Sequence, residues 1–397
     1  MSGKPHAVVV GSGPAGLMAA ERLSATGWRV EIMEAMPSPG RKFLMAGKSG
    51  LNLTMDEPLE DFIAAYGEAA PRLAPFLRAF GPAEVMAWAR GLGQEVFTGS
   101  SGRVFPVAMK ASPLLRAWLG RLAAEGCTLR TRWRWTGWAD DAGTRLVFET
   151  PDGSVERRPD RTVLALGGAS WRRLGSDGAW ADLLAAREVK LAPFRPANMG
   201  MARGWSAHMA PHLGQPVKNV ALMAGGRRVP GEFVLSARGL EGSGIYALYR
   251  ELRDGHPLTL DLVPGLDAET VARRLARRRK GETVNNHLRK ALGLDATKRA
   301  LLNETARPLP QAPEPLARLL KCLEVETDGP RPLDEAISTA GGIAWDALNP
   351  DLTLKALPNT TAHGEMLDWE APTGGYLITG CLATAVGWVS NPPRLVG

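Results

Sequence analysis

The stretch from Ala7 to Glu34 constrains the fold more than any other part of the chain. Ala7 to Val10 is a short β-branched run typical of a buried parallel strand, and it leads directly into Gly-x-Gly-x-x-Gly at residues 11–16. A helical stretch and a second apolar strand follow, and that strand ends at Glu34. This order of strand, glycine turn, helix, strand and acid predicts a βαβ unit that binds a dinucleotide.

The residue types of the glycine motif match the needs of a pyrophosphate. Gly11 permits the tight turn, Gly13 lets the backbone approach the phosphates, and Gly16 lets the helix lie close to the sheet. Pro14 and Ala15 open the helix, where free N–H groups and the positive end of the helix dipole face the phosphates. All five residues are therefore predicted to bind the cofactor.

Glu34 stands 18 residues after Gly16, and we expect Glu34 and the following residue, Ala35, to bind the cofactor. A carboxylate at this position accepts hydrogen bonds from an adenosine ribose and repels a 2′-phosphate. The unit therefore predicts FAD or NAD rather than NADP, and it does not separate the first two.

Composition sets broader limits. A chain of 397 residues suggests two or three domains, and a net charge of +7 would attract a dinucleotide, a carboxylate or RNA alike. The three cysteines are far apart and the six histidines lack metal-ligand spacing, so we expect neither a disulfide framework nor a metal site. No apolar run reaches the length of a membrane span and no signal peptide precedes the first strand, so we expect a cytoplasmic protein without a membrane anchor.

Two arginine-rich stretches could indicate nucleic-acid binding. Residues 273–280 hold five arginines and a lysine, with apolar residues at helical spacing, which is typical of a solvated helix face. Arginines and tryptophans alternate in Cys127–Trp138, as in a half-buried strand. We therefore expect a small-molecule substrate and no nucleic-acid partner, and the sequence does not indicate an oligomeric state.

The middle of the chain predicts further strands. Cys127–Trp138, Thr144–Thr150 and Val155–Arg158 form a three-stranded meander. The next apolar run ends at Gly167 and Gly168, which we expect at the carboxyl edge of the parallel sheet, in contact with the cofactor.

From residue 193 the βα alternation gives way to a different pattern. We expect an inserted substrate or lid domain over 193–328, with a β part at 193–265 and a helical part at 266–328. The first part of the FAD-binding domain is then 1–192 and its C-terminal part 329–397. The glycine-rich stretch 236–244 is either a lid or a hairpin connection.

Three glycine-bearing regions could hold a second half of the same ligand, which favours FAD over NAD. They are a long loop with little to bury up to residue 54, a glycine turn at 339–343, and the segments that precede an apolar helix at 377–389. The cofactor-binding residues predicted there are Gly40, Arg41, Lys42, Asn52, Leu53, Thr54, Gly341, Gly342, Gly364, Glu365, Gly374, Gly375 and Tyr376.

These motifs, in this order over nearly the whole chain, resemble the YhiN/BaiN-type NAD(P)/FAD-dependent oxidoreductases. The resemblance implies an α/β fold: a glutathione-reductase-like FAD-binding Rossmann domain, with a parallel sheet and a three-stranded meander, interrupted by an inserted β-barrel-like and small helical domain. It also implies non-covalent FAD. One departure is typical of a divergent subgroup: the family's Gly-Arg-Cys-Asn reads Ser49-Gly50-Leu51-Asn52 here.

The expected function is therefore an FAD-dependent oxidoreductase that transfers a hydride between flavin N5 and a small organic substrate, with NAD(P)H or oxygen as electron partner. No second Gly-x-Gly-x-x-Gly indicates a dedicated nicotinamide domain. His363, beside Gly364, is the predicted catalytic proton donor. The alternatives are a tRNA- or RNA-binding flavoprotein and a flavin-binding protein without turnover.

Overall fold

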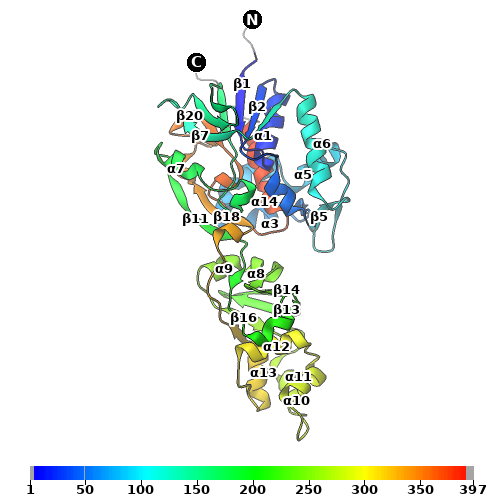
Figure 1. The fold of residues 1–397 in the computed structure, drawn as a ribbon. Helices are drawn as coiled ribbons and strands as arrows, with labels where there is room; N and C mark the ends of the chain where they lie inside the picture. Colours follow the sequence, from blue (N-terminus) through cyan, green and yellow to red (C-terminus); the bar gives the residue numbers. More distant parts are fainter. Residues whose placement is uncertain (1–3, 49, 390–397) are drawn as a thin grey trace. The chain divides into compact units, whose positions relative to one another are not determined.

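The computed structural model describes residues 4–48 and 50–389, and its contacts divide the chain into two units (Figure 1). Unit 1 holds the described residues up to Arg195 and from Ser338 onward, and unit 2 holds Pro196–Ile337. Residues 1–3, 49 and 390–397 lie outside the described ranges. They include the ends of the predicted segments 1–192 and 329–397, and Ser49, the first residue of the stretch that departs from the family motif.

The predicted end of the insertion, residue 328, comes too early. Ala202 N–H donates to Gly329 C=O (2.8 Å), Arg331 N–H donates to Gly200 C=O (2.9 Å), and Ile337 N–H donates to Asn198 C=O (3.3 Å). These backbone bonds hold residues 329–337 to unit 2, so the chain returns to unit 1 only at Ser338.

A six-stranded sheet forms the centre of unit 1. Its strands are parallel from β20 to β6, and only the edge strand β19 runs antiparallel. Val10 pairs with Met33 and Leu164, so the carboxyl ends of neighbouring strands meet at one edge. In sheet order the strands are β19 (Thr353–Leu354), β20 (Leu357–Ala362), β10 (Arg161–Leu164), β1 (His6–Val10), β2 (Arg29–Glu34) and β6 (Thr128–Thr131).

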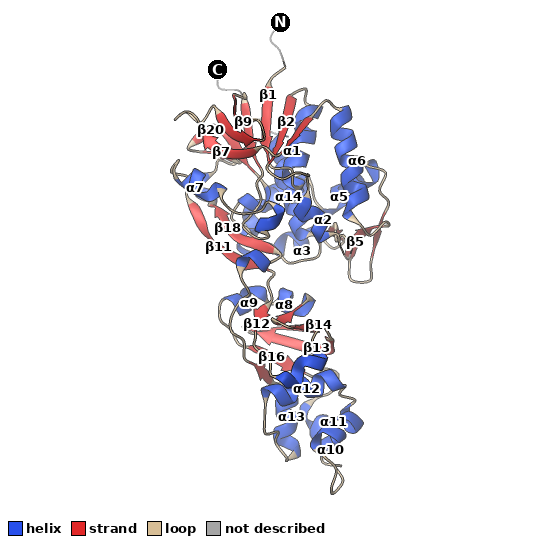
Figure 2. Cartoon of the chain, in the orientation of Figure 1, coloured by secondary structure: helices blue, strands red, loops and turns tan. Residues whose placement is uncertain are grey.

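Helices cover this sheet, and the last helix of the chain lies against the first (Figure 2). α14 packs on α1 and α4, which brings the C-terminal section beside the glycine motif. The helices of unit 1 are α1 (Pro14–Ala25), α2 (Arg41–Ala46), α3 (Leu59–Ala64), α4 (Ala70–Ala79), α5 (Pro82–Gly91), α6 (Ala111–Ala124), α7 (Trp180–Ala185) and α14 (Tyr376–Val389).

The meander is present, but its predicted first strand is wrong in extent. Residues 127–138 form two strands, because Arg132 adopts a φ of 60° and breaks the run after β6. The break is held by Trp133 N–H, which donates to Glu34 C=O (2.9 Å). β6 therefore joins the parallel sheet, and the meander consists of β7 (Arg134–Trp138), β8 (Leu146–Thr150) and β9 (Gly153–Arg157).

The predicted long loop before residue 54 is also wrong, because the segment buries apolar side chains. α2 buries Phe43, and Leu51 and Leu53 are fully buried. Leu53 N–H donates to Val104 C=O (2.8 Å), which leads the chain into a small sheet. That sheet consists of β3 (Thr54–Met55), β5 (Arg103–Pro106) and β4 (Val96–Thr98), and a separate two-stranded sheet consists of β11 (Leu191–Ala197) and β18 (Ser338–Ile343).

Unit 2 contains an antiparallel sheet and a helical part. An isolated bridge joins Met201, in the edge strand β12, to Pro330, which lies five residues after the opposite edge strand. The 236–244 stretch is a hairpin connection, in which Ser236 pairs with Gly239. In sheet order the strands are β12 (Met201–Ala202), β15 (Gly239–Glu241), β14 (Arg227–Ser236), β13 (Pro216–Ala224), β16 (Leu258–Asp261) and β17 (Leu323–Val325).

The helical part is shorter than the predicted 266–328, because β17 returns to pair with β16. Within the described ranges, no helix is both long enough and apolar enough to cross a membrane. The helices of unit 2 are α8 (Ser243–Ala247), α9 (Tyr249–Arg253), α10 (Ala268–Leu275), α11 (Val284–Leu292), α12 (Ala296–Thr305) and α13 (Pro313–Lys321).

Candidate functional site

The glycine motif joins β1 to the start of α1. The first helical hydrogen bond runs from Leu17 N–H to Gly13 C=O (3.0 Å). The N–H groups of Ala15 and Gly16 precede it and have no backbone acceptor among the described residues. With the positive end of the helix dipole, these donors form an anion site at the carboxyl edge of the sheet.

The glycines of the motif serve two different purposes. A Cβ on Gly16 would lie 2.0 Å from Gly11 C=O, so Gly16 is required by the packing of α1 on the turn. Apart from its chain neighbours, a Cβ on Gly13 would meet no atom of the described residues within 4 Å, and the φ of −76° at Gly13 suits any residue. Nothing in the protein requires a glycine at position 13, so the open space in front of it fits a bound pyrophosphate.

Glu34 lies at the end of β2, beside the glycine motif. Its carboxylate accepts a hydrogen bond from Met36 N–H (2.7 Å) and from both the hydroxyl and the N–H of Ser12. These bonds hold Glu34 at the mouth of the phosphate site, where the sequence places a ribose-binding acid.

A second polar cluster surrounds Glu365, which follows β20. The carboxylate accepts hydrogen bonds from Lys42 Nζ (2.8 Å), Thr339 N–H (3.0 Å) and Gly168 N–H (3.3 Å). Lys42 also donates to Ser170 Oγ (2.8 Å). One carboxylate therefore ties together α2, β18 and the turn that follows β10.

Both clusters line the same pocket, whose cavity volume is about 120 Å³. Arg41, which lines the pocket, has a buried Nε without a partner among the described residues, as expected where a polar ligand supplies the partner. Asn52, outside the lining, has an Oδ1 that is likewise buried without a partner among the described residues. The predicted residues that line the pocket are Gly11, Gly13, Pro14, Ala15, Glu34, Ala35, Gly40, Arg41, Lys42, Gly167, His363 and Glu365.

The other predicted residues do not line this pocket. Thr54 packs against the start of α14, where a Cβ on Gly375 would lie 2.3 Å from Thr54 Cα. Tyr376 O–H donates to Glu57 Oε1 (2.5 Å), and burial together with this bond raises the pKa of Tyr376. The remaining residues away from the pocket lining are Gly16, Asn52, Leu53, Gly168, Gly341, Gly342, Gly364 and Gly374.

Several pocket residues were missed by the sequence prediction. Trp133 and Trp135 line the pocket because β6 lies beside β2, so the residues after Thr131 emerge next to Glu34. A prediction that this strand pairs with the strand that ends at Glu34 would have identified both tryptophans as pocket residues. Leu174–Ser176 and Cys381 also line the pocket, and burial raises the pKa of the Cys381 thiol to about 12.

His363 is fully buried, and both ring nitrogens have partners. Nδ1 donates to Thr384 C=O (3.0 Å), so Nε2 is the acceptor for the Thr361 hydroxyl (3.0 Å). Burial lowers the pKa of His363 to about 4, which keeps the ring neutral at pH 7. The catalytic role of His363 stays a prediction, and this geometry favours a structural role in which the ring joins α14 to β20.

We expect His363→Ala to lower the free energy of unfolding by about 2–3 kcal/mol, because the cavity and the lost hydrogen bonds add. Turnover per bound flavin should not change. Because the folded pKa is depressed, the contribution of His363 is complete above its unfolded pKa of about 6.5 and is lost as the pH falls toward 4. Urea unfolding of the variant and the parent protein at pH 7 and at about pH 4.5 measures the loss of stability and its dependence on pH.

Thr361→Val is the matched control, because it removes only the Nε2 partner and should cost about 1 kcal/mol. A large fall in turnover of His363→Ala with flavin content and stability intact would restore the proton-donor assignment.

Comparisons with known proteins agree with this geometry. The family described as HI0933-like protein Rossmann domain matches residues 5–390. A relative from Clostridium scindens, named 3-dehydro-bile acid delta(4,6)-reductase, is 26% identical over 411 residues, which cover 95% of this chain and 96% of the relative.

Two solved structures share the fold. One is the 3-ketosteroid-delta4-(5alpha)-dehydrogenase of Rhodococcus jostii RHA1 in complex with 4-androstene-3,17-dione, with a TM-score of 0.54 and 17% identity over 98% of both chains. The other is the open conformation of a flavocytochrome c3 fumarate reductase, with a TM-score of 0.51 and 16% identity over 98% of this chain and 78% of that one. The predicted fold class is confirmed, and because the family match runs through almost the whole chain, the protein belongs to the HI0933-like Rossmann family.

Proposed function

We propose that this protein is an FAD-dependent oxidoreductase that transfers a hydride between flavin N5 and a small organic substrate. The observation that carries this function is the unfilled space in front of Gly13, at one end of a pocket that extends to Glu365. The family match, a relative named as a reductase and a fold shared with a dehydrogenase and a flavocytochrome support the same class.

The residues of unit 1 suit FAD in two sections. The N–H groups of Ala15 and Gly16 would hold the pyrophosphate, and Glu34 would hold the adenosine ribose. Arg41 and Asn52, with their unpartnered polar atoms, would bind polar groups farther along the cofactor. The segments at 341–342, 364–365 and 374–376 would support the flavin half.

When bound, the flavin supplies reversible hydride transfer at N5, so the chain itself needs to bind, orient and exclude water. Met33, Trp135 and Leu166 give the pocket apolar walls that exclude water. The ion pair of Lys42 with Glu365 places fixed charges at its other end. The Cys381 thiol stays protonated at neutral pH, so it acts as part of the wall and not as a thiolate nucleophile.

The purified protein should be yellow, with a flavin absorption spectrum, and heat should release FAD. Anaerobic mixing with NADH and with NADPH should then bleach the flavin with at least one donor, and air should restore the colour. A colourless protein that binds NAD would overturn the FAD assignment. Flavin that neither nicotinamide bleaches would overturn the reductase form and leave oxygen-dependent oxidation of a substrate.

A further inference from the structure

The positive charge of this protein is concentrated in one part of unit 2. Of the 48 lysines and arginines and 41 acids in the chain, residues 267–321 hold 13 and 6, so 35 of each remain elsewhere. The whole excess of seven therefore lies in these 55 residues. Surfaces of soluble domains usually mix both signs because like charges repel. A segment with 13 cations and six acids is an electrostatic footprint for an anionic partner.

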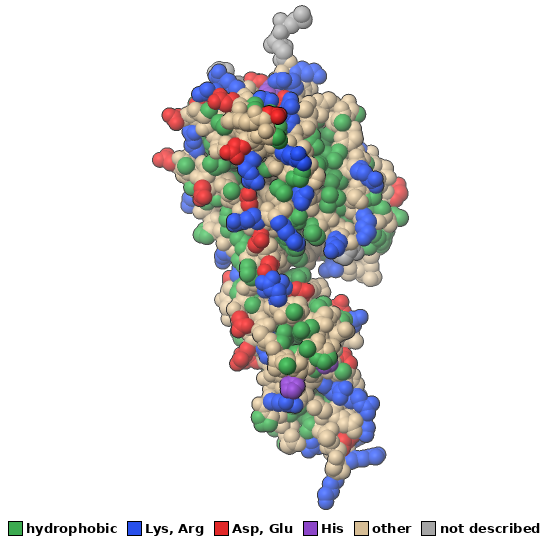
Figure 3. All heavy atoms as spheres, viewed as in Figure 1, with side chains coloured by type: hydrophobic (Ala, Val, Ile, Leu, Met, Phe, Trp, Pro, Cys, Tyr) green, Lys and Arg blue, Asp and Glu red, His purple; other side chains and the backbone are tan. Residues whose placement is uncertain are grey.

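The basic run does not continue as one helix face, contrary to the pattern expected from its spacing. α10 ends at Leu275, and the turn before α11, residues 276–283, carries Arg277, Arg279 and Lys280 on its exposed surface. None of these three cations has a carboxylate within ion-pair distance in the described part of the chain. Figure 3 shows lysine and arginine side chains gathered over this end of the unit.

The one carboxylate of this turn is already engaged. Glu282 accepts hydrogen bonds from Lys290 (3.0 Å) and from His287 (3.1 Å), and the bond from Lys290 is the main reason that the pKa of Glu282 is lowered. The turn itself therefore supplies no free carboxylate to the exposed cations.

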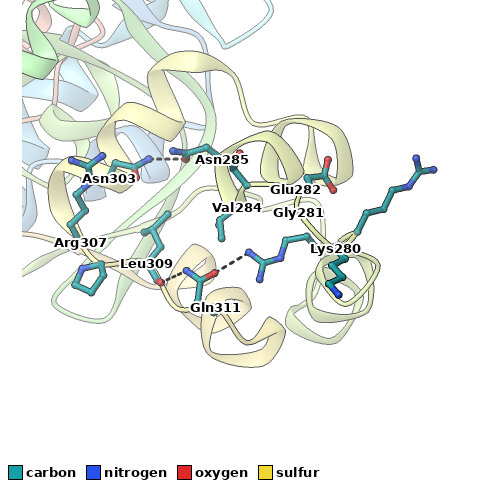
Figure 4. Close-up of a pocket in the computed structure, with 13 residues that line it drawn as sticks. Lys280, Gly281, Glu282, Val284, Asn285, Asn303, Arg307, Leu309 and Gln311 are labelled. Carbon is teal, nitrogen blue, oxygen red and sulfur yellow. Dashed lines mark hydrogen bonds between the residues drawn. The ribbon is translucent and has the colours of Figure 1, made fainter.

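A hollow of about 1070 Å³ opens beside this turn (Figure 4). Its walls are fixed by amide side chains: Asn303 Nδ2 donates to Asn285 Oδ1 (2.8 Å), and Gln311 accepts from Arg278 (3.0 Å) while it donates to Leu309 C=O (3.1 Å). Arg307 adds an exposed cation on the opposite wall. The hollow lies at the upper limit of the roughly 300–1,000 Å³ of small-molecule sites and is open to solvent, so it suits a segment of a polymer that lies along the surface.

The absence of certain side-chain types from residues 267–321 indicates which polymer this segment binds. Residues 267–321 contain no Phe, Tyr or Trp, so unpaired bases have no ring to stack on. The exposed large apolar side chains among the described residues, Leu59, Phe97 and Val107, belong to unit 1, so this end also has no wedge for a membrane. We propose that residues 267–321 bind the phosphate backbone of a double-stranded nucleic acid without reading its bases.

Fluorescence anisotropy of the full-length protein with a labelled duplex of about 20 base pairs, over salt from about 50 to 200 mM, tests this site. The test variant combines Arg277→Gln, Arg279→Gln and Lys280→Gln. It should weaken binding by at least about tenfold at low salt and reduce the slope of log K against log salt by about 2.7. The control combines Arg72→Gln, Arg90→Gln and Arg116→Gln, three exposed arginines of unit 1, and should bind like the parent.

All six positions are exposed, so circular dichroism should show equal folding, and the salt slope of the parent protein is a second measurement that needs no variant. Equal slopes for the triple variant and the parent would overturn the site. Preference for single-stranded nucleic acid, for polyglutamate or for vesicles rich in phosphatidylserine would also overturn it, in favour of base stacking, an acidic protein or a membrane surface respectively.

Discussion

Gly13→Val will purify without FAD while the apoprotein keeps its stability. The Cβ of the new side chain enters a space that the described part of the chain leaves open to 4 Å, and the extended backbone at Gly13 (φ −76°, ψ −178°) accepts valine without strain. We assign that space to the pyrophosphate, so the affinity for FAD should fall by at least about 100-fold, which is a loss of about 2.7 kcal/mol of binding free energy. Flavin content per protein and titration of the apoprotein with FAD measure the loss.

Gly16→Ala is the matched control, because it should destabilise the folded protein itself, whereas Gly13→Val should only prevent FAD binding. Its Cβ would lie 2.0 Å from Gly11 C=O, so α1 must move and the free energy of unfolding should fall by about 1–3 kcal/mol or more, with or without cofactor. Stabilities must be compared between apoproteins, since bound FAD stabilises the folded state by mass action. A Gly13→Val protein that retains FAD would place the phosphates elsewhere.

The dinucleotide unit could be predicted because its determinants are local. The residues from β1 to Glu34 form a continuous strand, turn, helix and strand, and each position is specified by its own neighbours in the chain. The sequence predicted Gly364 and Glu365 as cofactor-binding residues, but it did not predict that the strand before them joins the same parallel sheet. The bonds that converge on Glu365 could not be predicted, because Lys42 and Gly168 lie 323 and 197 residues away in the sequence, and Thr339, which is 26 residues away, belongs to a strand of a different sheet.

The errors arose where tertiary contacts override local pattern. The Arg132 turn that splits the Arg/Trp stretch depends on the backbone of Met36 and Glu34, which no periodicity in residues 127–138 reveals. The glycines and cations of residues 40–54 indicated a loop, yet Leu51 and Leu53 are core residues held by neighbours near residue 104. The second boundary of the insertion likewise depends on backbone pairing across unit 2.

Glu365→Ala should be among the most destabilising single substitutions in unit 1. The side chain of Glu365 is 12% exposed, and its removal leaves Lys42 without its ion pair and two N–H groups, of Thr339 and Gly168, without an acceptor. Breaking a buried pair on one side typically costs about 3–5 kcal/mol. We expect urea unfolding of the apoprotein to show a loss of this size and the purified protein to contain little FAD.

A double-mutant cycle separates the charge pair from the rest of the cluster. Glu365→Gln keeps an acceptor for one N–H group, and Lys42→Met leaves the carboxylate with both N–H donors, so each should cost less than Glu365→Ala. The Lys42 side chain is 28% exposed, so water screens part of its charge and the coupling energy should be about 1 kcal/mol, not several. If Glu365 also contacts the cofactor, Glu365→Gln will lose FAD affinity beyond its loss of stability. An apoprotein of Glu365→Ala as stable as the parent would mean that the four segments are held together by packing alone.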